Sequence, residues 1–302
     1  MKSTFLVAAC VGSAYGIHIV KLAQFMKKNI DPLVFPGAYR SHMHCFFGSP
    51  AVTVNTTTSD QISEGGCTTA TNLNDLSVYW VPELYTNIGG KLTEVPVYLQ
   101  AYYINIDKAE IPIPENFHAI AGNSKATSNA ETVSGSNIRI GCEDEQPSDR
   151  GVFPQKPCKG PMQTLLYFPD CVDTQTLKSV YARDNGWKCP SGYKRIPQLR
   201  FSARYDLNKA IPGGWSGTPP LQYSCGPSYC WHGDFINGWL PEAAKNMLRA
   251  THATKHEGVP GPNDSKVRGK NFCRVEDAHD ADPDRGTSDL AKSMQILKSY
   301  SP

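Results

Sequence analysis

The chain of 302 residues lacks the motifs that mark several common enzyme classes. It has no G-x-S-x-G nucleophile motif, no phosphate-binding loop and no H-E-x-x-H zinc motif. These absences argue against lipase-like hydrolases, nucleotide-dependent enzymes and zincin peptidases. No two cysteines have the C-x-x-C spacing, so a zinc ribbon has little support.

A strong charge of either sign is also missing. Lys and Arg total 30 against 28 Asp and Glu, the net charge is +2, and no run of basic residues occurs. Nucleic acid and anionic membrane surfaces are therefore not expected as partners. Beyond the N-terminus, no segment approaches the roughly 18 consecutive apolar residues that a membrane-spanning helix needs, so no membrane partner is expected either.

The N-terminus has the pattern of a secretory signal peptide. Lys2 is followed by the short apolar run Phe5–Val11 and then by the small-residue end Ala14–Gly16. The apolar run is too short to cross a bilayer as a helix. We therefore expect residues 1–16 to be a signal peptide and the mature protein to be secreted, either extracellular or associated with a cell wall.

The content of ten cysteines suits the oxidising compartment that a signal peptide implies. Cys10 lies in the expected signal peptide, and the odd number that remains means that one thiol is free, is a ligand, or pairs with another chain. Cys225 and Cys230 bracket a loop short enough to close as a disulfide just before His232. The nine mature cysteines are Cys45, Cys67, Cys142, Cys158, Cys171, Cys189, Cys225, Cys230 and Cys273, and glycosylation sequons begin at Asn55 and Asn263.

Aromatic and β-branched runs, evenly spaced between turns, predict a mainly β fold. We expect one β-sandwich or jelly-roll-like domain over residues 17–250, with long loops and disulfide staples, followed by a polar C-terminal extension over residues 251–302. Helix signals are scarce: Pro241–Ala250 opens with proline and an early acid, and Ser288–Tyr300 could form a second short helix. The predicted strands include Val78–Val81, Val95–Ile104, Phe117–Ala121, Ile138–Ile140, Thr164–Phe168 and Gln198–Tyr205.

Two segments far apart in the chain concentrate imidazoles. His42 and His44 stand two residues apart, a spacing that puts both side chains on one face of a strand. His232 could complete a set of three neutral imidazoles, which suits a single Zn or Cu ion with an open position. The alternative is that these histidines bond to loop carbonyls and brace the fold.

A carboxylate accompanies the third histidine. Asp234 would share the face of His232 on an extended segment, where it could orient the ring or act as acid or base. The candidate catalytic residues are therefore His232, Asp234, His42 and His44. Glycoside hydrolysis usually needs a second carboxyl. Asp170 and Asp173 are candidates for it, although both also suit a turn after proline.

Aromatic side chains near these segments could form a platform for a sugar. Trp80, Trp231 and Trp239 are the candidate substrate-binding rings, and Asn237 could donate a hydrogen bond to a substrate oxygen. Large aromatics are also the usual occupants of a core, and Asn before Gly is a common hairpin turn. Both interpretations remain open at this point.

The motifs resemble a secreted, mainly fungal family that is catalogued as a domain of unknown function. The likeness covers about residues 28 to 245 and includes Asp31–Val34 with Pro36 and Gly37, Ser41–His44, Phe168–Cys171 and His232–Trp239. Members look like extracellular proteins, sometimes joined to carbohydrate-binding or wall-associated modules, which implies a role toward polysaccharide. This chain has Ala70 where the family usually has a cysteine and Val172 where it usually has a tryptophan.

These observations lead to one functional expectation with one alternative. We expect a secreted protein that acts on or binds cell-wall polysaccharide, as a candidate hydrolase or lyase with a His/Asp site that could be metal-dependent. The alternative is a non-catalytic carbohydrate-binding or structural wall protein. Separations of about 3–4 Å between the ring nitrogens of His42, His44 and His232 would favour one shared metal.

Overall fold

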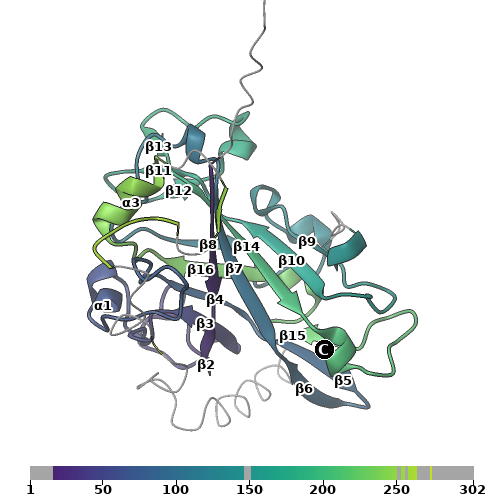
Figure 1. Cartoon of the computed structure of the whole chain (residues 1–302). Coiled ribbons are helices and arrows are strands. Elements are labelled where there is room, and N and C mark those ends of the chain that lie inside the picture. Colours follow the sequence, from purple (N-terminus) through teal and green to yellow (C-terminus); the bar gives the residue numbers. More distant parts are fainter. Residues whose placement is uncertain (1–15, 146–150, 250–252, 256–257, 264–272, 274–302) are drawn as a thin grey trace, which may run out of the picture.

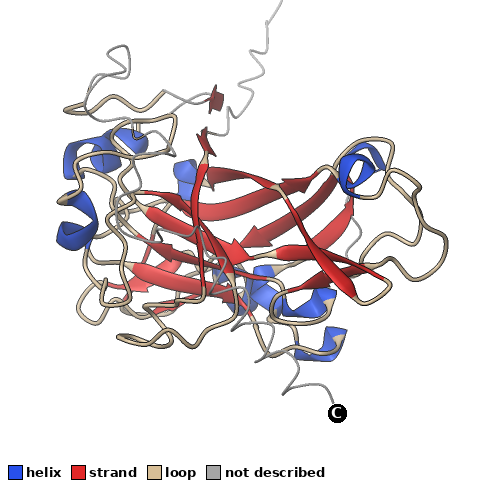
Figure 2. Cartoon of the chain, turned by 90° about the horizontal axis from the view of Figure 1, so that it is seen from below, coloured by secondary structure: helices blue, strands red, loops and turns tan. Residues whose placement is uncertain are grey.

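The computed structural model describes residues 16–145, 151–249, 253–255, 258–263 and 273. Within these residues the fold is mainly β, as predicted, with short helices and long loops at its periphery (Figures 1 and 2). The expected signal peptide and the helix expected at Ser288–Tyr300 lie outside the described residues, except for Gly16. No described helix has the length and apolar character needed to cross a membrane.

Two large sheets make up the body. The first has six strands in the order β17-β1-β7-β14-β10-β9, and the second has five in the order β2-β3-β4-β16-β8. The pairs are antiparallel except for β1 with β17. The strands of the first sheet are β17 (Ala253–Lys255), β1 (Ile17–Leu22), β7 (Val97–Ile104), β14 (Gln198–Tyr205), β10 (Met162–Tyr167) and β9 (Arg139–Cys142). Those of the second are β2 (Gln24–Lys28), β3 (His44–Gly48), β4 (Val78–Pro82), β16 (His232–Ile236) and β8 (His118–Gly122).

Two small sheets and the helices complete the described fold. One small sheet has the order β15-β5-β6 and the other β12-β11-β13. Their strands are β15 (Leu221–Tyr223), β5 (Leu84–Ile88), β6 (Lys91–Val95), β12 (Ser179–Val180), β11 (Cys171–Asp173) and β13 (Tyr193–Arg195). The helices are α1 (Ser59–Ser63), α2 (Leu207–Ala210) and α3 (Pro241–Met247), the last at the position predicted from its leading proline. Short 3-10 turns are η1 (Ile106–Lys108), η2 (Asn129–Glu131), η3 (Ser134–Ser136), η4 (Glu143–Glu145), η5 (Ala182–Asn185) and η6 (Ser228–Cys230).

The two large sheets pack face to face over the main core, which confirms the predicted sandwich. The ring of Tyr79 on β4 lies 5.8 Å from that of Phe201 on β14, between the layers. A side chain at Gly233 on β16 would collide with Phe201, so the glycine lets the sheets approach closely here. Strand β7 shows why its sequence forms a strand: buried and more exposed residues alternate along it with the period of two that one core face requires.

Three strands of the five-stranded sheet, β3, β4 and β16, are buried on both faces, which sets the environment of the site. Alternate residues of β3, β4 and β16 face the main core, and the others face a second apolar cluster on the outer side of the sheet. That cluster contains Phe46, Trp80 and Ile236 beneath covering loops. Every residue of these three strands is buried. Polar side chains of this outer face, such as His44 and Asp234, are therefore withdrawn from water.

Four disulfides connect the described cysteines and explain the odd number. The pairs are Cys67–Cys273, Cys142–Cys158, Cys171–Cys189 and Cys225–Cys230. Cys45 is the remaining thiol, and it is buried among apolar side chains. The short loop closed by Cys225 and Cys230 confirms the pairing expected there. The two departures from the family pattern, Ala70 and Val172, are both buried in the main core.

The main core contains one buried acid whose ionisation should make stability depend on pH. The carboxylate of Asp75 accepts hydrogen bonds from the Tyr79 hydroxyl and from the Ser77 backbone N–H. Burial raises the pKa of Asp75 to about 6 despite these bonds. Since the unfolded chain has the ordinary value of 3.8, the folded protein binds the proton more tightly. The stabilisation is complete below pH 3.8 and is lost as the pH rises through 6.

We therefore predict that Asp75→Asn changes the pH dependence of stability. Between pH 4 and 7 the wild type should lose roughly 2 kcal/mol of unfolding free energy that the variant keeps, because asparagine does not ionise. Urea unfolding of both proteins at the two pH values measures this. The same difference between the proteins at pH 4 and at pH 7 would contradict the assignment.

Candidate metal centre

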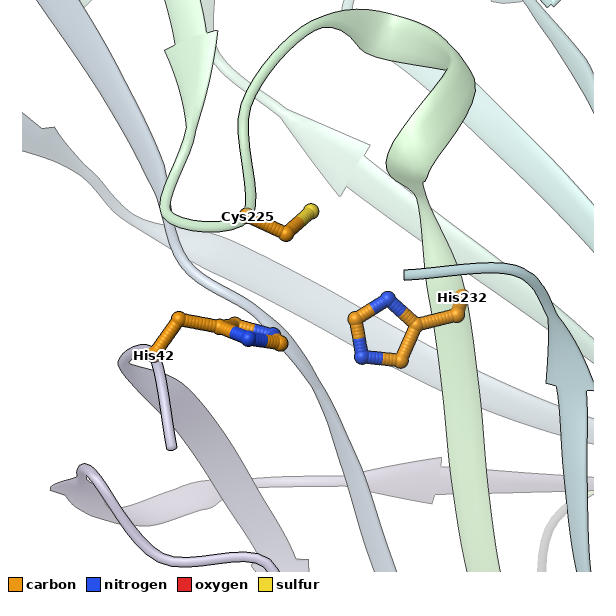
Figure 3. A group of neighbouring side chains, drawn as sticks. All are labelled: His42, Cys225 and His232. Atoms are coloured by element: carbon orange, nitrogen blue, oxygen red, sulfur yellow. The ribbon is translucent and has the colours of Figure 1, made fainter. Parts of the chain in front are cut away.

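Three imidazoles meet at one end of the five-stranded sheet. His44 opens β3, His232 opens β16, and His42 lies in the loop just before β3. Figure 3 shows the rings of His42 and His232 side by side. Strand β4 lies between β3 and β16 and is antiparallel to both, so β3 and β16 start at the same end of the sheet. The ring centroids are 4.2 Å apart for His42 and His44, 4.9 Å for His42 and His232, and 5.4 Å for His44 and His232. The two distant segments thus converge as expected.

The hydrogen bonds of two rings define which nitrogen carries the proton. Nδ1 of His44 lies 2.9 Å from the carbonyl oxygen of Ile30, and Nδ1 of His232 lies 2.7 Å from that of Cys230. A carbonyl oxygen can only accept, so both Nδ1 atoms are donors. In the neutral rings both Nε2 atoms are then bare acceptors. These two Nε2 atoms face each other at 3.2 Å.

Two facing acceptors need a proton or a cation between them. Burial lowers the pKa of His44 to about 4, and burial together with the neighbouring His44 lowers that of His232 to about 4. The pKa of His42 lies well below its usual value, mainly through burial and then through the other two rings. At neutral pH these values leave no proton to place between the rings, which favours a metal cation in that position.

Asp234 adds a carboxylate whose oxygens are not satisfied. Its side chain is fully buried, and neither oxygen has a hydrogen-bond partner among the described residues. The nearer oxygen, Oδ2, lies 3.7 Å from Nε2 of His232, too far for a hydrogen bond. Nε2 of His42 is likewise buried without a partner in the described part of the chain. Unpaired buried acceptors of this kind are costly, and a cation would satisfy them together.

The spacing of two donor nitrogens fits a tetrahedral ion. Zinc–nitrogen bonds of about 2.0–2.1 Å at tetrahedral angles separate two ligand nitrogens by roughly 3.3–3.4 Å. The observed 3.2 Å between the Nε2 atoms of His44 and His232 is close to this spacing. One ligand atom from each of His44, His232 and Asp234 lies within 4.8 Å of the other two. His42 forms a separate group of potential ligand atoms with His232 and Cys225. Imidazole nitrogens and a carboxylate oxygen are donors that suit Zn or Cu.

The sulfur of Cys225 lies beside the same rings but is not a thiolate. In Figure 3 its side chain extends toward the space between His42 and His232, and a ligand atom of each of the three lies within 4.8 Å of the others. The disulfide with Cys230 occupies this sulfur. The loop contributes in another way, because the carbonyl of Cys230 accepts the Nδ1–H of His232. The disulfide loop therefore orients the ring of His232.

Asp31 is the site residue that the sequence analysis did not assign. It is 4% exposed, and its Oδ1 accepts the backbone N–H groups of Leu33 and Val34. Burial raises its pKa, opposed by the Val34 N–H and by His232. Burial and then the charge of Asp31 raise the pKa of Asp234. The only sequence signal was Asp31-Pro32 at the start of the first family motif, where a turn was the natural interpretation.

The candidate sugar-binding residues lie away from an accessible surface. Trp231 and Trp239 belong to the main core at 0% and 2% exposure, so they lie between the sheets and not beside the histidines. Trp80 is also 0% exposed and stacks on Phe46 in the outer cluster, opposite Asp234 in the sheet register. None of the three indoles presents a face at the surface in this conformation.

The side-chain amide of Asn237 is hydrogen-bonded within the protein. Its Nδ2 donates to the carbonyl of Pro114, and its Oδ1 accepts the backbone N–H of Trp239. These bonds secure the turn after β16. In this conformation both ends of the Asn237 amide are engaged within the protein.

The two candidates for a second carboxyl are also accounted for elsewhere. Asp170 forms a buried ion pair with Arg195 and accepts the N–H of Ala182. Asp173 accepts the N–H groups of Gln175 and Thr176 and so caps a turn. Both belong to the region of β11, and the turn interpretation holds for Asp173. The second carboxyl near His232 is Asp31 instead.

Comparison with known proteins identifies a family and nothing more specific. A family model described as Domain of unknown function (DUF1996) matches residues 31–239. This range starts at Asp31 and includes His42, His44, His232 and Asp234. A search of the curated proteins and a search of the solved structures give no match.

Proposed function

Because the chain belongs to the DUF1996 family over residues 31–239, whose description assigns no activity, we propose a function from the site itself. The protein binds one Zn or Cu ion through His42, His44, His232 and Asp234. The observation that carries this proposal is the pair of Nε2 acceptors of His44 and His232, which face each other at 3.2 Å while both Nδ1 atoms donate to carbonyls. The unpaired carboxylate of Asp234 supports it.

The residues around this centre determine what chemistry it can support. Burial raises the pKa of Asp234 and lowers the pKa of His232, so burial alone disfavours the charged form of both groups. A cation held there would require the ionised form of Asp234, because a ligand carboxyl must be ionised. Asp31 then remains as the carboxyl that can hold or release a proton beside the centre. A bound divalent ion would supply Lewis acidity toward a substrate oxygen.

We propose further that the protein is secreted and acts on cell-wall polysaccharide as a metal-dependent hydrolase or lyase. The signal-like residues 1–16 and the four disulfides support an oxidising, extracellular destination. Asn55, the first residue of one glycosylation sequon, is exposed. The polysaccharide substrate and the fungal, wall-associated setting rest on the resemblance of the motifs to secreted wall-facing proteins.

One observation favours a second candidate function. His44, His232 and Asp234 are 0–2% exposed, and His42 is the least buried of the four groups. A centre this enclosed can stabilise a fold without admitting a polymer. In that case the protein is a non-catalytic wall or carbohydrate-binding protein whose metal joins β3 to β16.

The proposal predicts a bound metal and an activity that depends on it. Protein prepared without a nickel column should contain about one Zn or Cu per chain by mass spectrometry of the elements. Release of reducing ends from β-1,3-glucan, chitin or cellulose should stop after chelation and return when the metal is restored. Asp234→Asn should lower both metal content and product release, because it replaces an ionised ligand with a neutral one.

Asp60→Asn is the matched control, since Asp60 is an exposed acid of α1 away from the histidines. It should leave metal content and activity unchanged. Metal without product release on any of the three glycans would support the structural alternative. Absence of metal from the purified protein, with no uptake of added Zn or Cu, would refute the centre itself.

A further inference from the structure

Trp187 is an exposed indole held in an unusual backbone conformation. Its side chain is 62% exposed, although large aromatics are normally buried. Its φ is +65°, a region that bulky residues rarely adopt and that glycine occupies easily. Two unfavourable features thus coincide at one residue. Backbone strain of this kind is typical of functional positions.

The backbone at Trp187 is fixed from both sides. Its N–H donates to the carbonyl of Ala182 at 2.7 Å, and its own carbonyl accepts from the guanidinium of Arg195 at 3.2 Å. Arg195 is itself buried and ion-paired with Asp170. The disulfide between Cys171 and Cys189 ties the end of the loop to β11. The loop therefore fixes the backbone that carries the indole, which reduces the entropy lost when a ligand binds.

The surroundings of the ring indicate what kind of ligand it fits. The neighbouring residues 183–188 are all exposed, and they include charged and amide side chains. The guanidinium of Arg183 lies 5.9 Å from the ring centroid. A single ring with polar neighbours is not the contiguous apolar patch that a protein partner needs. The exposed indole is suited to one sugar ring. The C–H face of the sugar would pack on the indole, and the sugar hydroxyls would meet the polar side chains.

We propose that Trp187 is the stacking platform of a glycan-binding subsite, with Arg183, Asp184 and Lys188 as the polar groups around the sugar. The inference rests on the polysaccharide part of the proposed function but not on the metal. The loop belongs to the sheet of β11, β12 and β13, next to the start of β14 at Gln198. Trp231, which precedes His232, contacts Tyr205, so the histidines lie toward the other end of β14. Figure 1 likewise shows β11–β13 at the opposite end of β14 from β15 and β5. The subsite would therefore anchor a polymer at a distance from the histidines.

The test measures how well the protein is retained by insoluble polysaccharide. Wild type and variants are mixed with suspensions of β-1,3-glucan, chitin and cellulose, and the protein left in solution is measured across a range of polysaccharide concentrations. We expect wild type to bind at least one of the three and Trp187→Ala to bind it at least tenfold more weakly. Trp187→Phe should keep part of the binding, since it keeps an aromatic face.

Two further variants separate ring stacking from folding. Trp187→Gly removes the ring at a φ that glycine prefers, so it should lose retention without a lower melting temperature. Tyr98→Ala removes an aromatic ring that is 66% exposed on β7, and it should retain wild-type binding. Metal content should be unchanged in all of these variants. A loss of retention with normal metal content thus reports on this subsite, whatever the outcome for the metal centre.

The proposal is overturned if wild type binds none of the three polysaccharides, or if Trp187→Ala and Trp187→Gly bind as wild type does. It is also overturned if the variants only change the concentration at which the protein self-associates on size exclusion, because the ring would then be a protein contact. Equal losses in Tyr98→Ala and Trp187→Ala would assign the retention to exposed aromatics in general and would likewise overturn it.

Discussion

Replacing His232 by alanine should weaken the binding of Zn or Cu by at least about 100-fold, since it removes one of only three imidazole ligands. Nε2 of His232 faces Nε2 of His44 at 3.2 Å, and the variant loses one half of this pair. It also removes the imidazole whose Nε2 lies 3.7 Å from Oδ2 of Asp234. Isothermal titration of metal-free protein with each ion measures the change.

His118→Ala is the matched control for this prediction. His118 lies on β8, the neighbour of β16 in the sheet, and it is exposed. Its removal should leave the affinity and the stoichiometry of Zn or Cu binding unchanged. Unchanged affinity in His232→Ala would contradict the proposed ligand set. If wild type and both variants bind Zn or Cu equally weakly, the ion is bound at the protein surface.

Thermal unfolding gives a second measurement on the same variants. An ion present at about 100 times its dissociation constant stabilises the folded state by roughly 2.7 kcal/mol. In a protein of this size that corresponds to a rise of about 5 °C or more in melting temperature. Wild type and His118→Ala should show this rise, and His232→Ala should not. Far-ultraviolet circular dichroism before heating establishes that the variant is folded.

The second large effect is expected from Gly48→Ala, which should destabilise the fold by more than about 4 kcal/mol. Gly48 ends β3 with φ +93°, and an added Cβ would lie 1.9 Å from the backbone oxygen of Ser77. The obstacle is backbone of the neighbouring strand region, so it cannot rotate away as a side chain can. The backbone N–H of Gly48 also donates to Thr69, a bond that any displacement would break.

Gly66→Ala tests whether the clash, rather than backbone conformation alone, produces this loss. Gly66 has φ +65° but no atom within 4 Å of an added Cβ. Its substitution should cost only about 1–2 kcal/mol, the strain of the left-handed conformation. Urea unfolding compares the two variants with wild type. Equal losses in both would show that the close approach to Ser77 is relaxed in solution.

The variant that loses more stability, Gly48→Ala, should also bind metal more weakly than Gly66→Ala. His44 begins the strand that Gly48 ends, so displacement of β3 moves one ligand relative to His232 on β16. Gly66→Ala should bind metal as wild type does. Gly48→Ala, where it can be purified, should bind it more weakly.

Local features of the sequence were sufficient for the fold class and for the location of the candidate centre. Strand runs such as Val95–Ile104 follow from residue type and periodicity, and the helix at Pro241 follows from its leading proline. The pairing of Cys225 with Cys230 follows from a loop of only a few residues. His42, His44, His232 and Asp234 were recognised because imidazoles and a carboxylate among apolar residues need partners. All of these inferences use neighbours along the chain.

The roles of the individual site residues depended on contacts between segments that are distant in the sequence. Whether Trp80, Trp231 and Trp239 stack on a sugar or fill a core is decided by which sheet face each occupies and by what covers that face. Asp31 acquires its importance only because its loop is folded against His232 and Asp234. The facing of two Nε2 acceptors requires β4 to lie between β3 and β16. Residue type and local spacing determine which side chains can bind an ion or a sugar, and sheet order, covering loops and burial decide which of them do.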